Sequence, residues 1–135
     1  MSLRLAVIPV VLGCLGACTL TSDEDLLGTF DDVPPRVLEV FPPDGWEEVP
    51  TGVEIRIRFS EPVDPASEQR GSITLISGED LAEGSFEVAE ALVVFTPLKP
   101  LISGVVYRLA VTAWVTDLYG NPLESRVETT FRTLQ

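Results

Sequence analysis

Residues 53–59 read VEIRIRF, and this stretch decides the fold class. Apolar side chains occupy its odd positions, from Val53 to Phe59, and charged side chains occupy positions 54, 56 and 58. Successive side chains of a strand point to opposite faces of a sheet. The alternation therefore predicts a strand with one face buried and the other in water.

Six further segments, on both sides of this stretch, are also short and rich in apolar residues, and Pro, Gly, Asp or Asn separates them. They are residues 36–41, 72–76, 84–88, 92–96, 106–115 and 127–133. No segment keeps a helical period of apolar residues over several turns. Short strands at this spacing predict an all-β fold, a seven-stranded antiparallel sandwich or barrel.

Composition excludes several classes of function. The 135 residues include 9 Lys and Arg against 21 Asp and Glu, a net charge of −12, and the chain has no histidine. The acidic balance argues against nucleic acid as a partner, since phosphate binding needs a basic face. Without histidine the chain lacks the commonest general base, the commonest zinc ligand and any Ser–His or Cys–His nucleophile pair.

The first eighteen residues have the pattern of an exported protein. Arg4 is their only charged residue, and an apolar run of thirteen residues follows it, from 5 to 17. That run is shorter than the roughly 20 residues of a membrane-spanning helix. A basic start, a short apolar core and small residues before a cleavage point are typical of a secretory signal peptide.

Residues 15–18 read LGAC and resemble the lipobox of bacterial lipoproteins. The resemblance implies cleavage between Ala17 and Cys18, and a diacylglycerol on the Cys18 thiol that anchors the protein to a membrane. Cys14 is a second candidate, with a shorter apolar run before it. In the lipoprotein sorting pattern, aspartate after the lipidated cysteine retains the protein in the inner membrane. Thr19 in that place favours the outer membrane, if the source has one.

Residues 19–33 contain five acidic residues and no basic one, without a period of 2 or 3.6. This composition predicts a solvated tether. We therefore expect a signal peptide at 1–17, the lipidated Cys18 and the acidic tether at 18–33, and one β-sandwich domain at 34–135. Both cysteines precede that domain, so no disulfide framework can stabilise it.

Four sequence pieces occur in order along the predicted domain: VFPPDG at 40–45, IRFSEPVD at 57–64, FTP at 95–97 followed by LISGVVY at 101–107, and VTDLYGNPL at 115–123 with FRT at 131–133. Together they are similar to the bacterial Ig-like domain of the S-layer (SbsA) type. The resemblance covers essentially 34–134 and implies a seven-stranded Ig-like β-sandwich of Greek-key topology.

Several of these residues have predictable structural roles. Tyr107, preceded by Leu101 and Gly104, resembles the tyrosine corner of Ig-like sandwiches, whose phenol bonds to nearby backbone. The Asp117 carboxylate is placed to cap the amides of its own turn. Three aromatic residues are expected to anchor the core: Phe59, Phe95 and Phe131.

Calcium is the only metal that the sequence favours, because it takes carboxylate and carbonyl oxygens without histidine. The candidate ligands lie in turns that would share one end of a sandwich, and they are Glu61, Asp64, Asp117 and Asn121. The alternative is that these residues cap turns. No pair of carboxylates is marked as facing across a cleft, so we expect no enzyme activity.

An exposed aromatic platform would bind glycans, and the candidates are Trp46, Trp114 and Tyr119. The alternative is that Trp114 and Tyr119 pack over the end of the sandwich. An open sheet edge is a third possible binding surface, for a partner strand. The sequence thus predicts a non-catalytic envelope lipoprotein that displays one Ig-like module for structural, adhesive or protein-interaction roles. The competing hypotheses are a glycan-binding module and a calcium-stabilised accessory subunit of an envelope complex.

Overall fold

The computed structural model describes residues 31–68 and 71–135, and the compact domain within it is Asp32–Gln135. The predicted signal peptide, its cleavage site at Ala17 and Cys18, and nearly all of the predicted tether lie outside the described residues.

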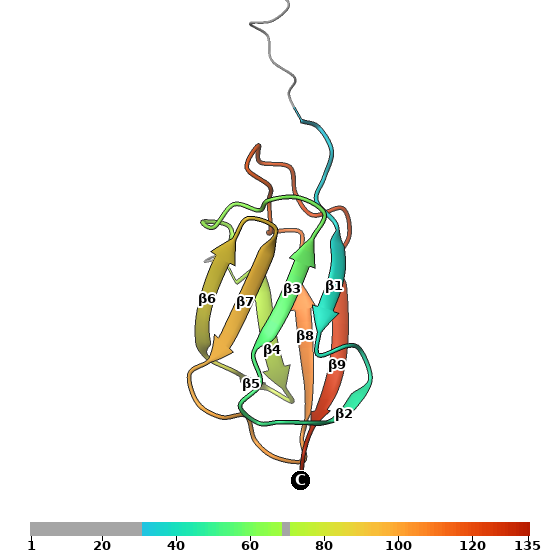
Figure 1. Ribbon diagram of the computed structural model, residues 1–135, viewed down its shortest axis with the longest axis vertical. Helices are drawn as coiled ribbons and strands as arrows, with labels where there is room; N and C mark the ends of the chain where they lie inside the picture. Colours follow the sequence, from blue (N-terminus) through green and yellow to red (C-terminus); the bar gives the residue numbers. More distant parts are fainter. Residues whose placement is uncertain (1–30, 69–70) are drawn as a thin grey trace, which may run out of the picture. The chain divides into compact units, whose positions relative to one another are not determined.

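The domain is a sandwich of two sheets (Figure 1). One sheet has four strands, in the order β1 (Val37–Phe41), β3 (Ile55–Phe59), β7 (Leu92–Pro97) and β6 (Gly84–Ala89). The other has five, in the order β2 (Trp46–Val49), β9 (Val127–Thr133), β8 (Val106–Val111), β4 (Ile73–Ser77) and β5 (Asp80–Leu81). Four strands ordered A-B-E-D facing a sheet that contains C, F and G is the Ig-like arrangement. The predicted all-β Ig-like sandwich is confirmed.

All seven predicted strands are present, and the structure adds two short ones, β2 and β5. The sequence of β2 is WEEV, which does not alternate, and β5 has only two residues, so neither has a readable period. Gly45 donates a hydrogen bond to the Thr130 carbonyl (2.7 Å), and the Thr130 amide donates one to Asp44 Oδ1 (2.7 Å). These bonds bring the chain from β1 onto the opposite sheet. There β2 pairs parallel to β9, a departure from the purely antiparallel prediction.

The strand expected at 106–115 ends at Val111, and this boundary of the prediction is wrong. The Thr112 hydroxyl donates a hydrogen bond to the Ser72 carbonyl (3.1 Å), and the Val115 amide donates one to the Thr112 carbonyl (3.2 Å). These bonds turn the chain away from β9, so Trp114 lies in a turn and not on a strand.

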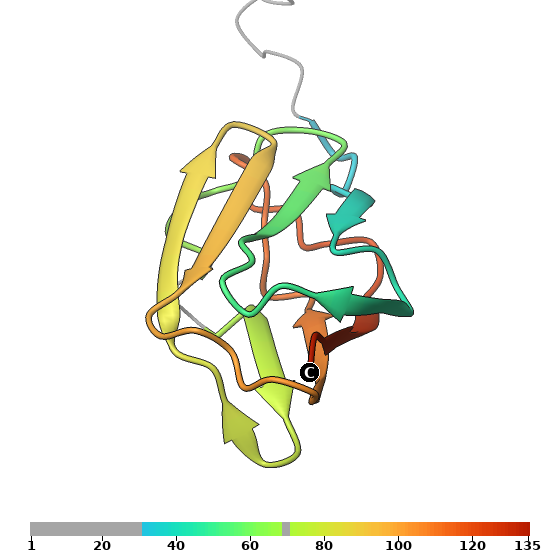
Figure 2. The ribbon, with the colours of Figure 1, turned by 60° about the horizontal axis from the view of Figure 1, so that its bottom comes forward.

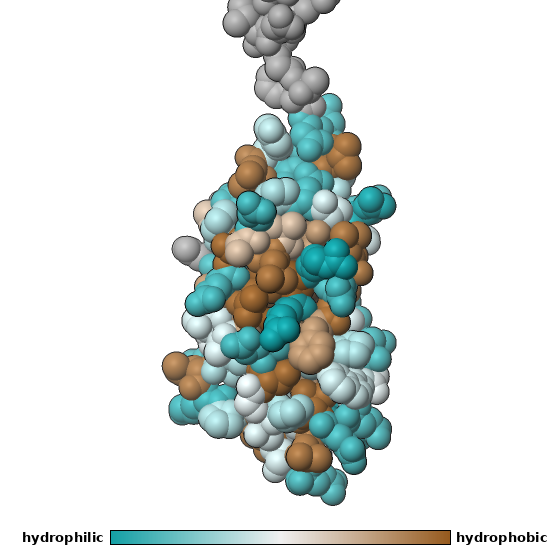
Figure 3. Space-filling view, viewed as in Figure 1, coloured by the Kyte–Doolittle hydropathy of each residue, from teal (hydrophilic) through white to brown (hydrophobic). Residues whose placement is uncertain are grey.

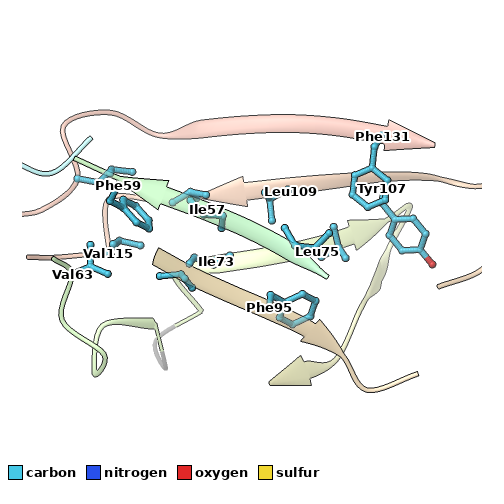
Figure 4. Close-up of a cluster of buried hydrophobic side chains, with 14 of the residues drawn as sticks. Ile57, Phe59, Val63, Ile73, Leu75, Phe95, Tyr107, Leu109, Val115 and Phe131 are labelled. Carbon is cyan, nitrogen blue, oxygen red and sulfur yellow. The ribbon is translucent and has the colours of Figure 1, made fainter. Parts of the chain in front are cut away.

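The core lies between the inner faces of the two sheets (Figure 4). All three inward positions of β3, Ile55, Ile57 and Phe59, are buried, as the alternation predicted. Phe95 and Phe131 are buried as well, which confirms the three aromatic anchors. Burying one such side chain contributes about 1.5–3 kcal/mol, so this layer is the main source of stability.

The tyrosine corner is also confirmed. The Ile102 amide donates a hydrogen bond to the Tyr107 phenol oxygen (2.9 Å), and the Tyr107 ring stacks on Phe131 with 5.8 Å between ring centroids. The buried Thr133 hydroxyl donates to the Ile102 carbonyl (2.5 Å) and accepts a bond from the Val105 amide (2.9 Å). Two side chains therefore fix the connection between the sheets that leads from β7 to β8.

Substituting Tyr107→Phe keeps the ring and removes the acceptor of the Ile102 amide. We expect a loss of about 1–2 kcal/mol in the free energy of unfolding, because a partly buried donor is left without its partner. Urea denaturation measures it. Tyr119→Phe is the control, since that phenol belongs to an exposed residue. Equal effects of the two substitutions would contradict this role of the Tyr107 hydroxyl.

Gly84 is a position where any side chain is excluded by packing. A Cβ there would overlap the Thr96 carbonyl oxygen and come within 2.5 Å of a Phe95 ring carbon. We expect Gly84→Ala to lower the free energy of unfolding by about 1–3 kcal/mol, because backbone and core must shift. Gly52→Ala is the matched control, since nothing lies within 4 Å of its added Cβ. Equal melting temperatures of the two variants in thermal denaturation would contradict the packing constraint at Gly84.

Candidate functional site

Three segments meet at the end of the sandwich where the chain enters β1, and we call this the proximal end (Figure 1). It consists of residues 32–36, 60–66 and 112–124. The Ser60 amide donates to the Arg36 carbonyl (2.8 Å), the Asp64 amide to the Thr116 carbonyl (2.8 Å) and the Glu124 amide to the Pro35 carbonyl (3.0 Å). These bonds join segments that are far apart in the sequence into one surface.

All four candidate calcium ligands lie at the proximal end. Val63 forms a β-bridge with Asp117, which brings the turn of Glu61 and Asp64 beside the turn of Asp117 and Asn121. Carboxylate oxygens of Glu61 and Asp117 lie within 4.8 Å of each other. The structure therefore brings the four residues into the same region, as the sequence led us to expect.

Asp117 is the structural centre of its turn and is only 1% exposed. Its Oδ1 accepts hydrogen bonds from the amides of Tyr119 and Asn121 (both 2.8 Å), and its Oδ2 accepts one from the Asn121 side chain (2.7 Å). The capping role predicted for Asp117 is confirmed. Burial raises the pKa of this carboxyl, but the hydrogen bonds from Asn121, Tyr119 and Gly120 outweigh that effect, so its pKa lies below the ordinary 3.8.

Two of the other three candidate ligands, Asp64 and Asn121, also have structural partners. Asp64 Oδ1 accepts a hydrogen bond from the Ala66 amide (2.9 Å), and the Asn121 amide group serves Asp117. These bonds account for the Asp64 and Asn121 side chains as parts of turns. The calcium site stays a prediction; among its four candidate ligands, the Glu61 and Asp117 carboxylates come within 4.8 Å of each other.

Asp117→Asn places an amide group where the Asn121 amide needs an acceptor. We expect a loss of about 1–3 kcal/mol in unfolding free energy at pH 7. Because the folded-state pKa of Asp117 is lowered, its stabilisation is complete above the ordinary value of 3.8 and is lost as the pH falls through the folded-state pKa. The difference in unfolding free energy between wild type and Asp117→Asn should therefore shrink at low pH.

Urea denaturation at pH 7 and at pH 3 measures both effects. Asp80→Asn is the matched control, because Asp80 is an exposed residue of the edge strand β5. A constant difference between wild type and Asp117→Asn at both pH values would contradict the role of the charge.

The aromatic candidates separate into two places. Trp114 and Tyr119 lie in the β8–β9 connection at the proximal end and are 64% and 66% exposed. The alternative that they pack over the sandwich end is therefore wrong. Leu118 beside them is 63% exposed, and sequence reasoning missed it as a surface residue. Leu118 lies between a capping aspartate and Tyr119-Gly120, and this position in a turn was the sequence signal that could have indicated its exposure.

The third aromatic candidate, Trp46, begins β2 and packs edge-on against Phe41, with ring centroids 5.5 Å apart.

The outer face of the four-stranded sheet mixes hydrophilic and hydrophobic surface (Figure 3), and the exposed residues of β3 are Arg56 and Arg58. Arg58 pairs with Glu39 (2.9 Å), and the Arg56 guanidinium lies 5.6 Å from the centre of the Phe41 ring. With Leu92 these four residues line a hollow of about 200 Å³. Exposed ion pairs of this kind contribute about 0–1 kcal/mol each, so this face is a solvated surface and not a source of stability.

The fold, the tyrosine corner and the capped turn agree with one family. A sequence profile of the bacterial Ig-like domain matches residues 31–133. The chain belongs to this family. No curated protein sequence matches the chain significantly.

Solved structures share the fold at low sequence identity. The S-layer protein rSbsC(31-844) aligns with a TM-score of 0.54 and 17% identity, over 93% of this chain and 16% of that one. The N-terminal part of SbsC gives 0.54 and 16% identity, over 95% and 29%. An L,D-transpeptidase from Mycobacterium smegmatis gives 0.55 and 23% identity, over 76% and 41%. This chain thus spans less than half of each of these proteins, and the likeness concerns the fold.

In the ranges 31–68 and 71–135 no helix is long and apolar enough to cross a membrane.

Proposed function

We propose that this protein is a non-catalytic lipoprotein of the bacterial cell envelope that displays a single Ig-like module. The observation that carries the proposal is a lipobox-like LGAC at 15–18 placed ahead of a bacterial Ig-like domain, with an acidic segment between them. Cleavage before Cys18 and acylation of its thiol would tether the domain by lipid. Two or more acyl chains hold a protein stably on a membrane, whereas one holds it only marginally.

The geometry of the domain suits display. The chain enters at the proximal end, and its C terminus lies at the opposite, distal end (Figure 1), which Figure 2 turns toward the viewer. An anchor before residue 32 would therefore leave both outer sheet faces and the distal end available to partners. The acidic segment would repel an anionic membrane surface and keep the module accessible. Thr19 supports the outer membrane as the location in a diderm cell.

The distal end is the surface that best supports an interaction role. Leu81, Leu98 and Ile102 are all more than half exposed there, around an open hollow of about 230 Å³ that Lys99 also lines. Tyr107 and Thr133 hold the 98–105 loop in place. Exposed apolar side chains on a fixed loop are typical of a protein-binding surface. The role we propose is therefore structural or adhesive, through protein contacts.

The intact mass of the protein purified from a bacterial host tests the proposal. We expect a mature chain that begins at Cys18 and carries the added mass of acyl groups, and Cys18→Ala should abolish both the cleavage and the added mass. Cys14→Ala is the matched control and should be processed like wild type, because Cys14 lies within the removed segment. An unmodified N terminus cut elsewhere, or processing that depends on Cys14 and not on Cys18, would overturn the lipid anchor at Cys18.

A further inference from the structure

The β8–β9 connection at the proximal end carries three exposed apolar side chains, Trp114, Leu118 and Tyr119, and we call this part of the connection the aromatic turn. About two-thirds of each residue's surface is in water. Large apolar side chains exposed on one short connection are a candidate contact surface for another phase or molecule. These side chains are not part of the sandwich core. The tyrosine corner and the 98–105 loop lie at the other end of the domain.

The aromatic turn is held in a defined shape. The Asp117 amide donates to the Asn121 carbonyl (3.0 Å), Thr116 and Pro122 form a β-bridge, and Asp117 Oδ1 accepts the Tyr119 amide. Leu118 and Tyr119 therefore lie at the apex of a closed turn in which Asp117 is buried. Their exposure is a consequence of the fold, because these bonds hold the backbone that presents them.

The chain's own connectivity indicates what covers the turn. Residues 32–36 belong to the same end, since the Pro35 carbonyl accepts the Glu124 amide. Thirteen residues separate Cys18 from Asp32, and they span at most about 45 Å when fully extended. In the lipid-anchored protein proposed above, the aromatic turn is thus confined near the bilayer. Such confinement raises the effective concentration of the membrane surface, so a weak affinity is sufficient for contact.

The chemistry of the turn fits the membrane interface. Tryptophan and tyrosine combine an apolar ring with a polar tip, and they are enriched at the boundary between lipid headgroups and acyl chains. The neighbouring carboxylates of Glu61 and Asp64 disfavour an anionic surface. They are compatible with zwitterionic headgroups, whose outermost charge is positive. The preferred occupant is therefore a zwitterionic lipid interface.

We propose that the aromatic turn inserts Trp114, Leu118 and Tyr119 into the zwitterionic headgroup region of the bilayer that holds the Cys18 anchor. This inference rests on the proposed lipid anchor. Docking at the proximal end would orient the sandwich upright, with the distal end directed away from the membrane.

The two tryptophans of the chain allow a direct test. Trp46→Phe leaves Trp114 as the reporter at the proximal end, and Trp114→Phe leaves Trp46 as a matched reporter on β2. The acylated protein is reconstituted in phosphatidylcholine vesicles with and without brominated acyl chains, and tryptophan fluorescence is recorded. We expect brominated lipid to quench the fluorescence of Trp114 at least twofold, compared with vesicles whose acyl chains carry no bromine. Trp46 should be unaffected.

A further variant, Leu118→Asp on the Trp46→Phe background, should reduce the quenching of Trp114. Leu98→Asp at the distal end should leave it unchanged. Acylated protein that floats with vesicles but shows equal quenching of Trp114 and Trp46 overturns the docking and leaves the anchor intact. A chain that carries no acyl mass overturns the anchor, and the docking with it. The two failures are therefore distinguishable.

Discussion

Ile55, Ile57 and Phe59 on one sheet face Leu75 and Leu109 on the other, and this shared apolar layer has to exclude water along the whole sandwich. No covalent link assists it, because both cysteines precede residue 19. Strands β3, β4, β7, β8 and β9 each contribute buried side chains to this layer. The exposed arginines of β3 lie outside it because the backbone period sends alternate side chains to solvent.

At the two ends of this layer, different buried polar side chains form hydrogen bonds with the backbone of the connecting loops. At the distal end, the Tyr107 phenol and the Thr133 hydroxyl satisfy the backbone of the 101–105 segment. At the proximal end, the Asp117 carboxylate accepts the amides of its own turn. Both ends bury polar side chains and leave neighbouring apolar side chains in water. The hydrogen bonds that hold the loops at each end therefore also determine which apolar side chains are exposed for recognition.

This division gives the proposed function a physical basis. The family's fold supplies a rigid body, and in the proposed lipoprotein the anchor at Cys18 would decide which end faces the membrane. The proximal end would then meet lipid, and the distal end, with its exposed Leu98 and Ile102, would meet a protein partner. The carboxylates of Glu61 and Asp117, which the structure brings close together, lie where a turn is built.

Several features were readable from local pattern alone. The alternation at 53–59 predicted β3, the spacing of apolar runs predicted the other long strands, and the LISGVVY piece predicted the tyrosine corner, because each depends on residues close together in the chain. The capping role of Asp117 was predictable for the same reason, since its partners lie within four residues.

The parallel strand β2, the early end of β8 and the exposure of Trp114 and Tyr119 were decided only by tertiary structure. Each depends on a bond to a distant segment, such as Thr130 for β2 and Ser72 for the end of β8. A sequence pattern shows the periodicity of one segment. It does not show which distant carbonyl will accept a hydrogen bond from that segment. The sequence by itself therefore determined the sandwich and its capped turns, and the long-range hydrogen bonds decided which side chains its two ends present to solvent.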